Sequence, residues 1–275
     1  MGKLLDKLRR VQAGGRPFCT MIVPAAGSSA RMGGGDKLMM ELEGVPVLVR
    51  TLRALDAAQL VDEIIIATRE DRLLEVADLC RRCGLRKPVR VVQGGENRTQ
   101  SVLAAACEAD AKAQFIAVHD GARPLVLPED VDAVIRFACQ THAAAPALPV
   151  TDTVKTADET GRVTGTPDRS TLFAVQTPQV FQADVLKAAL QSAAEAKLPL
   201  TDDCAAVERL GRSTSCPAIP KISRLRARSI WRSPPRFCGR ERSGTHDKPA
   251  HRTRLRRTPA RAGAAADSRR RTCRL

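Results

Sequence analysis

The stretch that decides the fold is "VPAAGSSARMGGGDKLMMEL", residues 23–42. It continues from "FCTMIV" (18–23), a short apolar run that is typical of a buried strand. Small residues and two cations, Arg31 and Lys37, then follow. Glycine and alanine let a backbone approach a ligand closely, and exposed N–H groups beside positive charge bind anions. The stretch therefore predicts a phosphate-binding loop, with a solvated surface turn as the equally weighted alternative.

Neither of the two common phosphate motifs explains this loop. The stretch has no terminal GK[ST] of a Walker loop and no GxGxxG spacing. The chemistry of the loop must therefore be inferred from its surroundings.

The charge of the 275-residue chain is concentrated at its end. The net charge is +15, but 19 of the 45 Lys and Arg and only three of the 30 Asp and Glu lie in residues 212–275. Residues 1–211 therefore carry a net charge of −1. A near-neutral body with a separate basic end argues against a fold built to bind nucleic acid specifically, although a basic arm remains open.

Other features of the composition point to a cytoplasmic protein. No apolar run reaches the roughly 18 residues that span a bilayer, and residues 1–18 lack the apolar core of a signal peptide. Nine cysteines are scattered along the chain, and Cys80 with Cys83 forms its one CxxC. Since a four-ligand zinc site needs a second such pair, a plain helix end is the favoured interpretation of this motif over metal or redox chemistry.

Strand-like and helical patterns alternate along the body. Apolar β-prone runs occupy 61–68, 89–95, 115–124 and 144–155. Between them, residues 46–58, 71–83, 98–110 and 129–141 repeat apolar side chains at helical spacing. This order predicts an α/β fold, a mostly parallel sheet with helices on both faces, and ligands bind such sheets outside the carboxyl ends of the strands.

Two further segments at strand ends carry candidate chemistry. In "VHDGARP", Asp120 and Arg123 follow an apolar strand, and a carboxylate there can hold Mg²⁺ against phosphate oxygens or simply cap the next turn. In "GGENRTQSV", Gly95 and Ser101 flank a helix start with Arg98 between them, which fits a base-binding loop or an ordinary helix N-terminus. His119 is expected to face the core or a carbonyl, without a catalytic role.

Six ordered motifs resemble one enzyme family. They are "VPAAGSSARMGGGDK", "GGENRTQSV", "VHDGARP", "PVTDTVK", "DRSTLFAVQTPQVF" and "TDDCAAVERLG". Together they resemble 2-C-methyl-D-erythritol 4-phosphate cytidylyltransferase, an enzyme of the non-mevalonate route to isoprenoids. The resemblance implies a Rossmann-like nucleotidyltransferase domain with a projecting β-arm, a homodimer formed through that arm, Mg²⁺, and transfer of CMP from CTP to methylerythritol phosphate.

The resemblance also assigns roles to individual residues. The catalytic positions are Arg31, Lys37 and Asp120, of which Asp120 also holds the metal. The nucleotide-binding positions are Ala25, Ala26, Gly27, Gly95, Glu96, Ser101 and Arg123. Thr153 and Arg169 match arm residues that reach the acceptor phosphate of the partner subunit. The implied organisation is an N-terminal extension at 1–17, a cytidylyltransferase domain at 18–212 with its arm at about 149–173, and a basic tail at 213–275.

The sequence departs from the family pattern in two places. The family commonly has a proline before the lysine of the opening loop, where this chain has Asp36. After "ERLG" the family continues with a strand and a phosphate-contacting lysine, whereas this chain becomes arginine-rich and loses its periodicity.

Two interpretations fit the second departure: the tail is a disordered basic extension, or it is read in a shifted frame. Codons that encode residues 213–223 permit a family-like segment in one shifted frame, and those for 246–260 permit the start of a cyclodiphosphate synthase in another. We therefore interpret the tail as frameshifted and outside the fold. We expect trypsin to trim the chain to near Arg212, and turnover of the chain as written to be slow.

Two other functions fit parts of the sequence. A ribitol 5-phosphate cytidylyltransferase uses the same fold and CTP site. An inactive body with a tail that binds nucleic acid nonspecifically is the second, but the arginines of the tail are interleaved with few aromatic side chains for base stacking.

Overall fold

The computed structural model describes residues 16–27, 36–213 and 223–226. Their main sheet has the order β10-β7-β11-β6-β1-β4-β5, with β12 paired to β7. The strands are β1 (Cys19–Pro24), β4 (Glu63–Thr68), β5 (Val89–Gln93), β6 (Phe115–Val118), β7 (Ala143–Pro149), β10 (Phe173–Val175), β11 (Gln179–Gln182) and β12 (Ser223–Arg226). Strands β5, β4, β1 and β6 run parallel, and β11 is antiparallel to both β6 and β7. The predicted mostly parallel sheet is confirmed.

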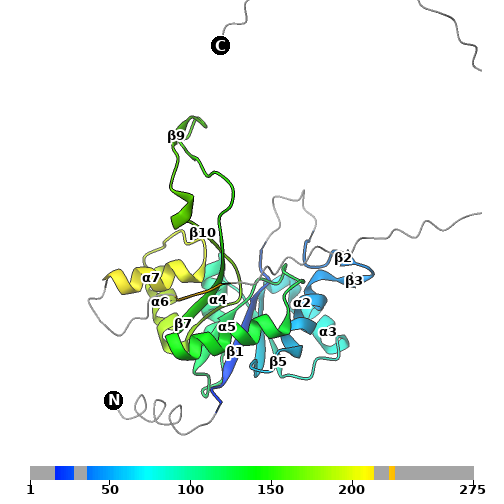
Figure 1. Ribbon diagram of the computed structural model, residues 1–275. Coiled ribbons are helices and arrows are strands. Elements are labelled where there is room, and N and C mark those ends of the chain that lie inside the picture. Colours follow the sequence, from blue (N-terminus) through cyan, green and yellow to red (C-terminus); the bar gives the residue numbers. More distant parts are fainter. Residues whose placement is uncertain (1–15, 28–35, 214–222, 227–275) are drawn as a thin grey trace, which may run out of the picture. The chain divides into compact units, whose positions relative to one another are not determined.

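Helices cover both faces of this sheet (Figure 1). They are α2 (Val47–Ala57), α3 (Leu73–Arg82), α4 (Arg98–Cys107), α5 (Pro128–Thr141), α6 (Ala183–Glu195) and α7 (Asp203–Ser213), with short 3-10 helices η2 (Glu70–Arg72) and η3 (Arg169–Thr171). The four helices predicted from periodicity all form. The strand predicted at 115–124 ends at Val118, because the chain then turns, with the Arg123 N–H donating to the Asp120 carbonyl (3.1 Å).

Alternating side chains of the central strands build two separate cores. In β1, Met21 and Val23 join the core formed with α2, α3 and α5, whereas Ile22 joins the core formed with α4, α6 and α7. In β4, Ile64 and Ile65 divide between the two cores in the same way. Since both faces of each strand are buried, the strands read as continuous apolar runs in the sequence.

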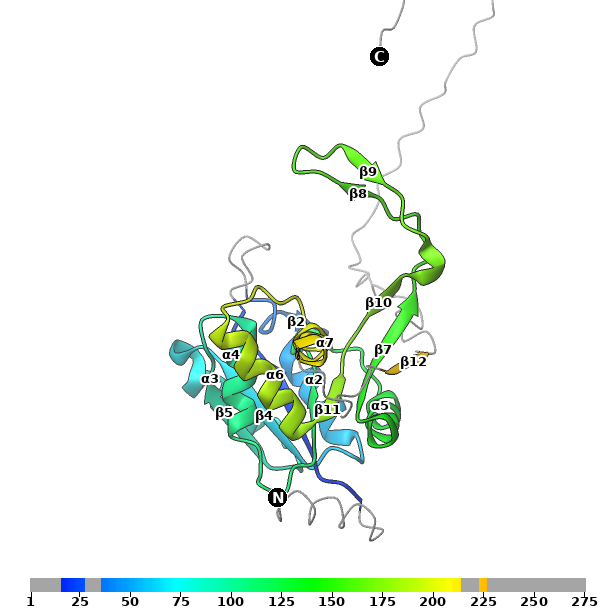
Figure 2. The same cartoon turned by 90° about the vertical axis from the view of Figure 1, so that its left-hand side faces the viewer.

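Two hairpins extend from this framework. Strands β2 (Glu41–Leu42) and β3 (Val45–Pro46) pair across Glu43 and Gly44, which both have positive φ. Strands β8 (Thr156–Ala157) and β9 (Val163–Gly165) pair only with each other among the described strands, beyond the ends of β7 and β10 (Figure 2). The second hairpin, whose residues are almost all exposed, lies within the segment expected to form an arm, 149–173.

The tail contributes one strand that the sequence did not predict. Strand β12 pairs in parallel with β7, with Ser223 opposite Ala144 and Arg226 opposite Ala147. The structure thus pairs these four residues with the main sheet, beyond the domain boundary expected at 212. Backbone hydrogen bonding explains the difference, since strand pairing joins main-chain groups and does not require an apolar sequence in β12. The rest of the tail lies outside the described residues.

The CxxC motif is part of a helix end, as expected. Cys80 is buried in α3 against the core and Cys83 follows the last residue of that helix. Burial raises the pKa of the Cys80 thiol to about 11. Within the described ranges, no cluster of three or more His, Cys, Asp or Glu side chains is arranged to hold a metal ion, and no helix is long and apolar enough to cross a membrane.

Candidate active site

A cavity of about 540 Å³ lies where the parallel strands end. Its walls come from the loops after β1, β4, β5 and β6, as the rule for open parallel sheets predicts. The residues that line it are Pro24, Ala26, Gly27, Arg69, Gly95, Glu96, Asn97, Arg98, Ser101 and Asp120. Five of these, Ala26, Gly27, Gly95, Glu96 and Ser101, were expected to bind nucleotide, and Asp120 was expected to hold a metal.

Close backbone packing fixes one wall of the cavity. The Ala25 N–H donates to the Ala67 carbonyl and the Gly94 N–H to the Thr68 carbonyl, each at 2.7 Å. A methyl group at Gly94 would lie 2.7 Å from Ser101 Oγ and 3.2 Å from the Ala26 side chain. Glycine is thus required at position 94, because the loop after β5 lies directly against the loop after β1.

Ser101 holds the glycine loop against the start of α4. Its hydroxyl accepts a hydrogen bond from Gly95 N–H (3.1 Å) and can donate to the Asn97 carbonyl (2.8 Å). Asn97 caps the helix by accepting from Gln100 N–H (2.9 Å). The first turn of α4 therefore lines the cavity, and the positive end of a helix dipole favours a bound anion.

Asp120 sits between two guanidinium groups. One carboxylate oxygen lies 2.9 Å from Arg123 Nε, and the other lies 3.6 Å from an Arg98 nitrogen. Arg98 in turn forms two hydrogen bonds, of 2.9 and 2.8 Å, with the buried carboxylate of Asp203. Burial alone would lower the pKa of Arg98, but Asp203 and Asp120 outweigh it and raise that pKa. The prediction that the charge of Arg98 lies near the glycine loop is confirmed.

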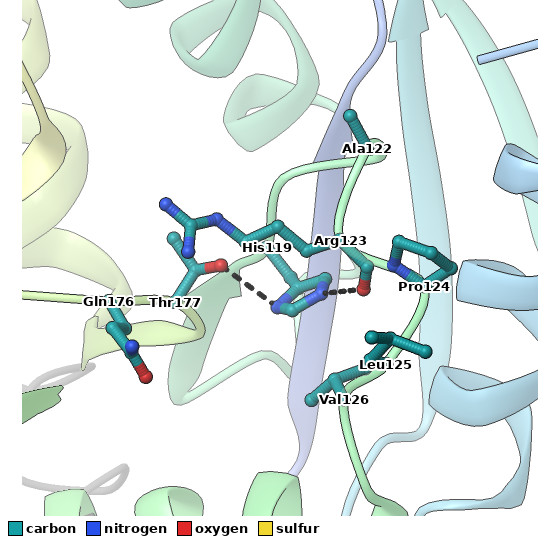
Figure 3. A pocket seen from close by; sticks show the side chains of 8 residues that line it. All are labelled: His119, Ala122, Arg123, Pro124, Leu125, Val126, Gln176 and Thr177. Atoms are coloured by element: carbon teal, nitrogen blue, oxygen red, sulfur yellow. Dashed lines mark hydrogen bonds between the residues drawn. The ribbon is translucent and has the colours of Figure 1, made fainter. Parts of the chain in front are cut away.

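Arg123 itself faces a second, smaller cavity of about 250 Å³ (Figure 3). Its lining is mainly apolar and includes Pro124, Leu125 and Val126. His119 lies here, buried, with Nε2 3.2 Å from the Arg123 carbonyl and Nδ1 3.0 Å from the Thr177 hydroxyl. His119 was expected to face the core or a neighbouring carbonyl, and the contact with the Arg123 carbonyl confirms the second of these.

Of the two cations of the opening loop, the structure describes only Lys37. Arg31 lies outside the described residues. Lys37 begins a turn before β2, is half-buried, and does not appear among the residues that line the larger cavity. Asp36 supports this turn by accepting from Leu38 N–H (2.9 Å) and by pairing with Arg72. Asp36 thereby braces the turn at the position where the family commonly has a proline.

The two expected acceptor-binding residues lie in the arm. Thr153 and Arg169 are exposed, and Arg169 donates to the Thr151 carbonyl (2.9 Å). Neither lines the described cavity. Within one chain, these two arm residues are therefore separate from the larger cavity.

The donor set at the cavity can accommodate Mg²⁺ only with help from a substrate. Asp120 and Glu96 are the two carboxylates in the lining, and the side chain of Asp120 is 33% exposed. Mg²⁺ is commonly held by one or two carboxylates together with substrate phosphates. The residues present fit that arrangement and not an all-protein cage.

Sequence reasoning missed Pro24, Arg69 and Asn97 in the lining of the cavity, and Asp203, which pairs with Arg98. Arg69 lines the cavity and is oriented by Asp71, with contacts of 3.1 and 2.8 Å. Arg69 directly follows a predicted strand. The rule that ligands bind at the carboxyl ends of parallel strands, which selected Asp120, could therefore have selected Arg69 as well. Asp203 begins a helix far along the chain, and no sequence pattern indicated its partner.

Comparison with known proteins places this fold and cavity in a family. Residues 19–217 match the family model described as 2-C-methyl-D-erythritol 4-phosphate cytidylyltransferase. The chain belongs to this family. The match includes every residue that lines the larger cavity.

Individual relatives agree with the family model. A 2-C-methyl-D-erythritol 4-phosphate cytidylyltransferase of Symbiobacterium thermophilum is 44% identical over 203 residues, which are 73% of this chain and 84% of that protein. One from Frankia casuarinae is 44% identical and covers 71% of each chain. The crystal structure of 4-diphosphocytidyl-2C-methyl-D-erythritol synthase from Anaerococcus prevotii superposes with a TM-score of 0.67 at 26% identity, covering 78% of this chain and 88% of that one. The predicted Rossmann-like nucleotidyltransferase fold is confirmed.

Proposed function

We propose that this chain transfers CMP from CTP to 2-C-methyl-D-erythritol 4-phosphate, giving 4-diphosphocytidyl-2-C-methyl-D-erythritol and pyrophosphate. The observation that carries the proposal is that one family match, 19–217, contains the whole lining of the larger cavity. The reaction belongs to the non-mevalonate route to isoprenoids, and we place it in the cytoplasm.

The cavity supplies the groups that such a transfer needs. An oxygen of the acceptor phosphate attacks the α-phosphorus of CTP, and the bond to the pyrophosphate leaving group breaks. Negative charge grows on the oxygens around that phosphorus, and fixed positive charges and N–H dipoles lower the barrier where it grows. We assign the base and ribose to the loop around Gly95, Glu96 and Ser101, and the phosphates to the loop from Ala25 to Gly27 with Arg31 and Lys37.

Mg²⁺ is the proposed cofactor, with Asp120 as its protein ligand. When bound, the ion neutralises charge on the phosphates. Arg123 keeps the carboxylate of Asp120 oriented. EDTA should then abolish turnover, and added Mg²⁺ should restore it.

A homodimer completes the acceptor site in this proposal. Thr153 and Arg169 lie in the exposed arm and away from the cavity of their own chain. The arm of a second copy would bring these two side chains to the acceptor phosphate. Light scattering of the purified protein tests the assembly directly.

Pyrophosphate release tests the reaction. Methylerythritol phosphate and ribitol 5-phosphate are offered side by side with CTP, and then with UTP. We expect release with CTP and methylerythritol phosphate. Preference for ribitol 5-phosphate would move the chain to the other substrate class, and no release with either acceptor would overturn the proposed activity.

A further inference from the structure

We propose that Asp203 is a positioning residue for cytidylyl transfer, acting through Arg98 on the carboxylate of Asp120. The inference rests on the proposed function, because Asp120 is taken as the metal ligand of that reaction. Asp203 belongs to the "TDDCAAVERLG" motif, to which the reaction as described so far assigns no role.

The contact between Asp203 and Arg98 consists of two hydrogen bonds to a buried carboxylate. Both oxygens of Asp203 accept hydrogen bonds from Arg98, at 2.9 and 2.8 Å, and Asp203 is only 1% exposed. Two-pronged pairs of this kind fix the plane of a guanidinium as well as its position. Arg98 therefore has one orientation, and that orientation places a nitrogen 3.6 Å from Asp120.

Asp203 is itself held in place from the sheet. Gln179 of β11 accepts hydrogen bonds from the Asp203 and Cys204 N–H groups, each at 3.1 Å. The amide of the same Gln179 side chain donates to Asp202 (2.9 Å). Since Asp203 is the first residue of α7, the helix dipole also favours a carboxylate there. Hydrogen bonds or ion pairs thus connect each member of the series from β11 to Asp203, Arg98 and Asp120.

The distances show what Asp203 does for the site. At 3.6 Å, Arg98 is close enough to Asp120 to orient it but is committed to Asp203 at shorter range. Without the charge of Asp203, the guanidinium would be free to pair directly with Asp120. That pair would draw the carboxylate away from Arg123 and change its orientation in the cavity. The consequence is a misplaced carboxylate in a site that otherwise binds CTP normally.

A role confined to folding makes a different prediction. A contact that only joins α7 to α4 would lower thermal stability without changing turnover per folded molecule. Asp202→Asn is the matched control, since Asp202 directly precedes the same helix, accepts from Ala205 N–H (2.9 Å) and from the Gln179 amide (2.9 Å), and forms neither of the hydrogen bonds that hold Arg98. It should lower the melting temperature and leave kcat unchanged.

A double-mutant cycle in turnover is the test. Asp203→Asn preserves the shape of the side chain and should lower kcat by about tenfold, with the Kd for CTP from calorimetry changed by less than about threefold. In an Asp120→Asn background, the same substitution should change kcat by less than about twofold, because its target is already lost. An equal loss in both backgrounds would overturn the proposal, and so would an unchanged kcat with lowered stability.

The possible failures can be told apart. If Asp203→Asn does not remain folded at the assay temperature, Arg98→Lys replaces it in the cycle, because it retains the charge and loses the two-pronged contact. If the unsubstituted chain releases no pyrophosphate, the proposed function fails together with the inference. If it is active and the cycle is additive, the inference alone fails.

Discussion

Ser101→Ala should weaken CTP binding and leave the chemical step nearly unchanged. Ser101 is 1% exposed, and its hydroxyl accepts from Gly95 N–H at 3.1 Å and can donate to the Asn97 carbonyl at 2.8 Å. Alanine removes both hydrogen bonds. Water can replace the hydroxyl at the exposed Gly95, but it cannot reach the buried side of the loop. A lost bond of this kind costs about 1–2 kcal/mol, which corresponds to an increase of about 5- to 30-fold in the KM for CTP.

The assay is pyrophosphate release with CTP varied at saturating acceptor. Thr20→Ala is the control, since the Thr20 hydroxyl is also fully buried and donates to Glu63 at 2.7 Å, but Thr20 does not line the cavity. It should lower stability and leave both kinetic constants unchanged. A KM for CTP within about twofold of the unsubstituted value in folded Ser101→Ala would refute the role given to this hydroxyl.

The packing around Gly94 provides a second test of the same wall. Gly94→Ala places a methyl group 2.7 Å from Ser101 Oγ and should raise the KM for CTP by moving the loop. In the double variant Gly94→Ala/Ser101→Ala the oxygen is gone, and the nearest remaining contacts are carbon atoms at 3.2 Å. The double variant should therefore bind CTP no more weakly than Gly94→Ala alone. If the increase in the KM for CTP in the double variant equals the product of the two single increases, the two residues act independently.

Three further predictions concern other parts of the molecule. Asp120→Asn and Lys37→Ala should each lower kcat by about 100- to 1000-fold with little loss of stability, and normal turnover in either would remove that residue from the site. Thr153→Ala and Arg169→Ala should raise the KM for the acceptor more than that for CTP, whereas equal effects would contradict the role of the arm. Burial lowers the pKa of His119 to about 4, from about 6.5 when unfolded. Between these two pKa values the imidazole of residue 119 binds a proton in the unfolded chain but not in the folded chain. The free energy of unfolding therefore falls as the pH falls. His119→Gln should reduce the loss between pH 7 and 5, measured by urea unfolding, by about 2 kcal/mol.

The sequence predicted those parts of the fold that depend on local periodicity. Both buried faces of β1 and β4 appear as unbroken apolar runs, and α2 and α5 repeat their apolar residues at helical spacing. Strand β12 could not be predicted, because its pairing rests on backbone hydrogen bonds to β7 and its own sequence is polar. The antiparallel strand β11 was likewise not separated from its surroundings, since only four residues form it.

The candidate site was predictable to the extent that strand ends mark it. Gly95 and Asp120 each follow a strand, Ser101 lies at the start of the helix after the first of these strands, and all three line one cavity. Asp203 was not predictable, because its contact with Arg98 spans 105 residues of sequence. A contact of that range depends on how two helices pack, and no local pattern in either helix specifies it.

The order of strands in the sheet also determines when the site can form during synthesis. Strand β1 pairs with β4 and with β6, so Cys19 can pair with Phe115 only after Phe115 has been synthesised. Both cores contain side chains from these same strands. Neither core can close before β6 has left the ribosome, because each needs its residues as a wall. Folding dominated by such distant pairings is slow compared with folding from local contacts. The apolar faces of β1 and β4 are thus exposed to aggregation for longest. Chaperone dependence should last until β11 has emerged, because this strand follows the arm and supplies Val180 to one core and Phe181 to the other.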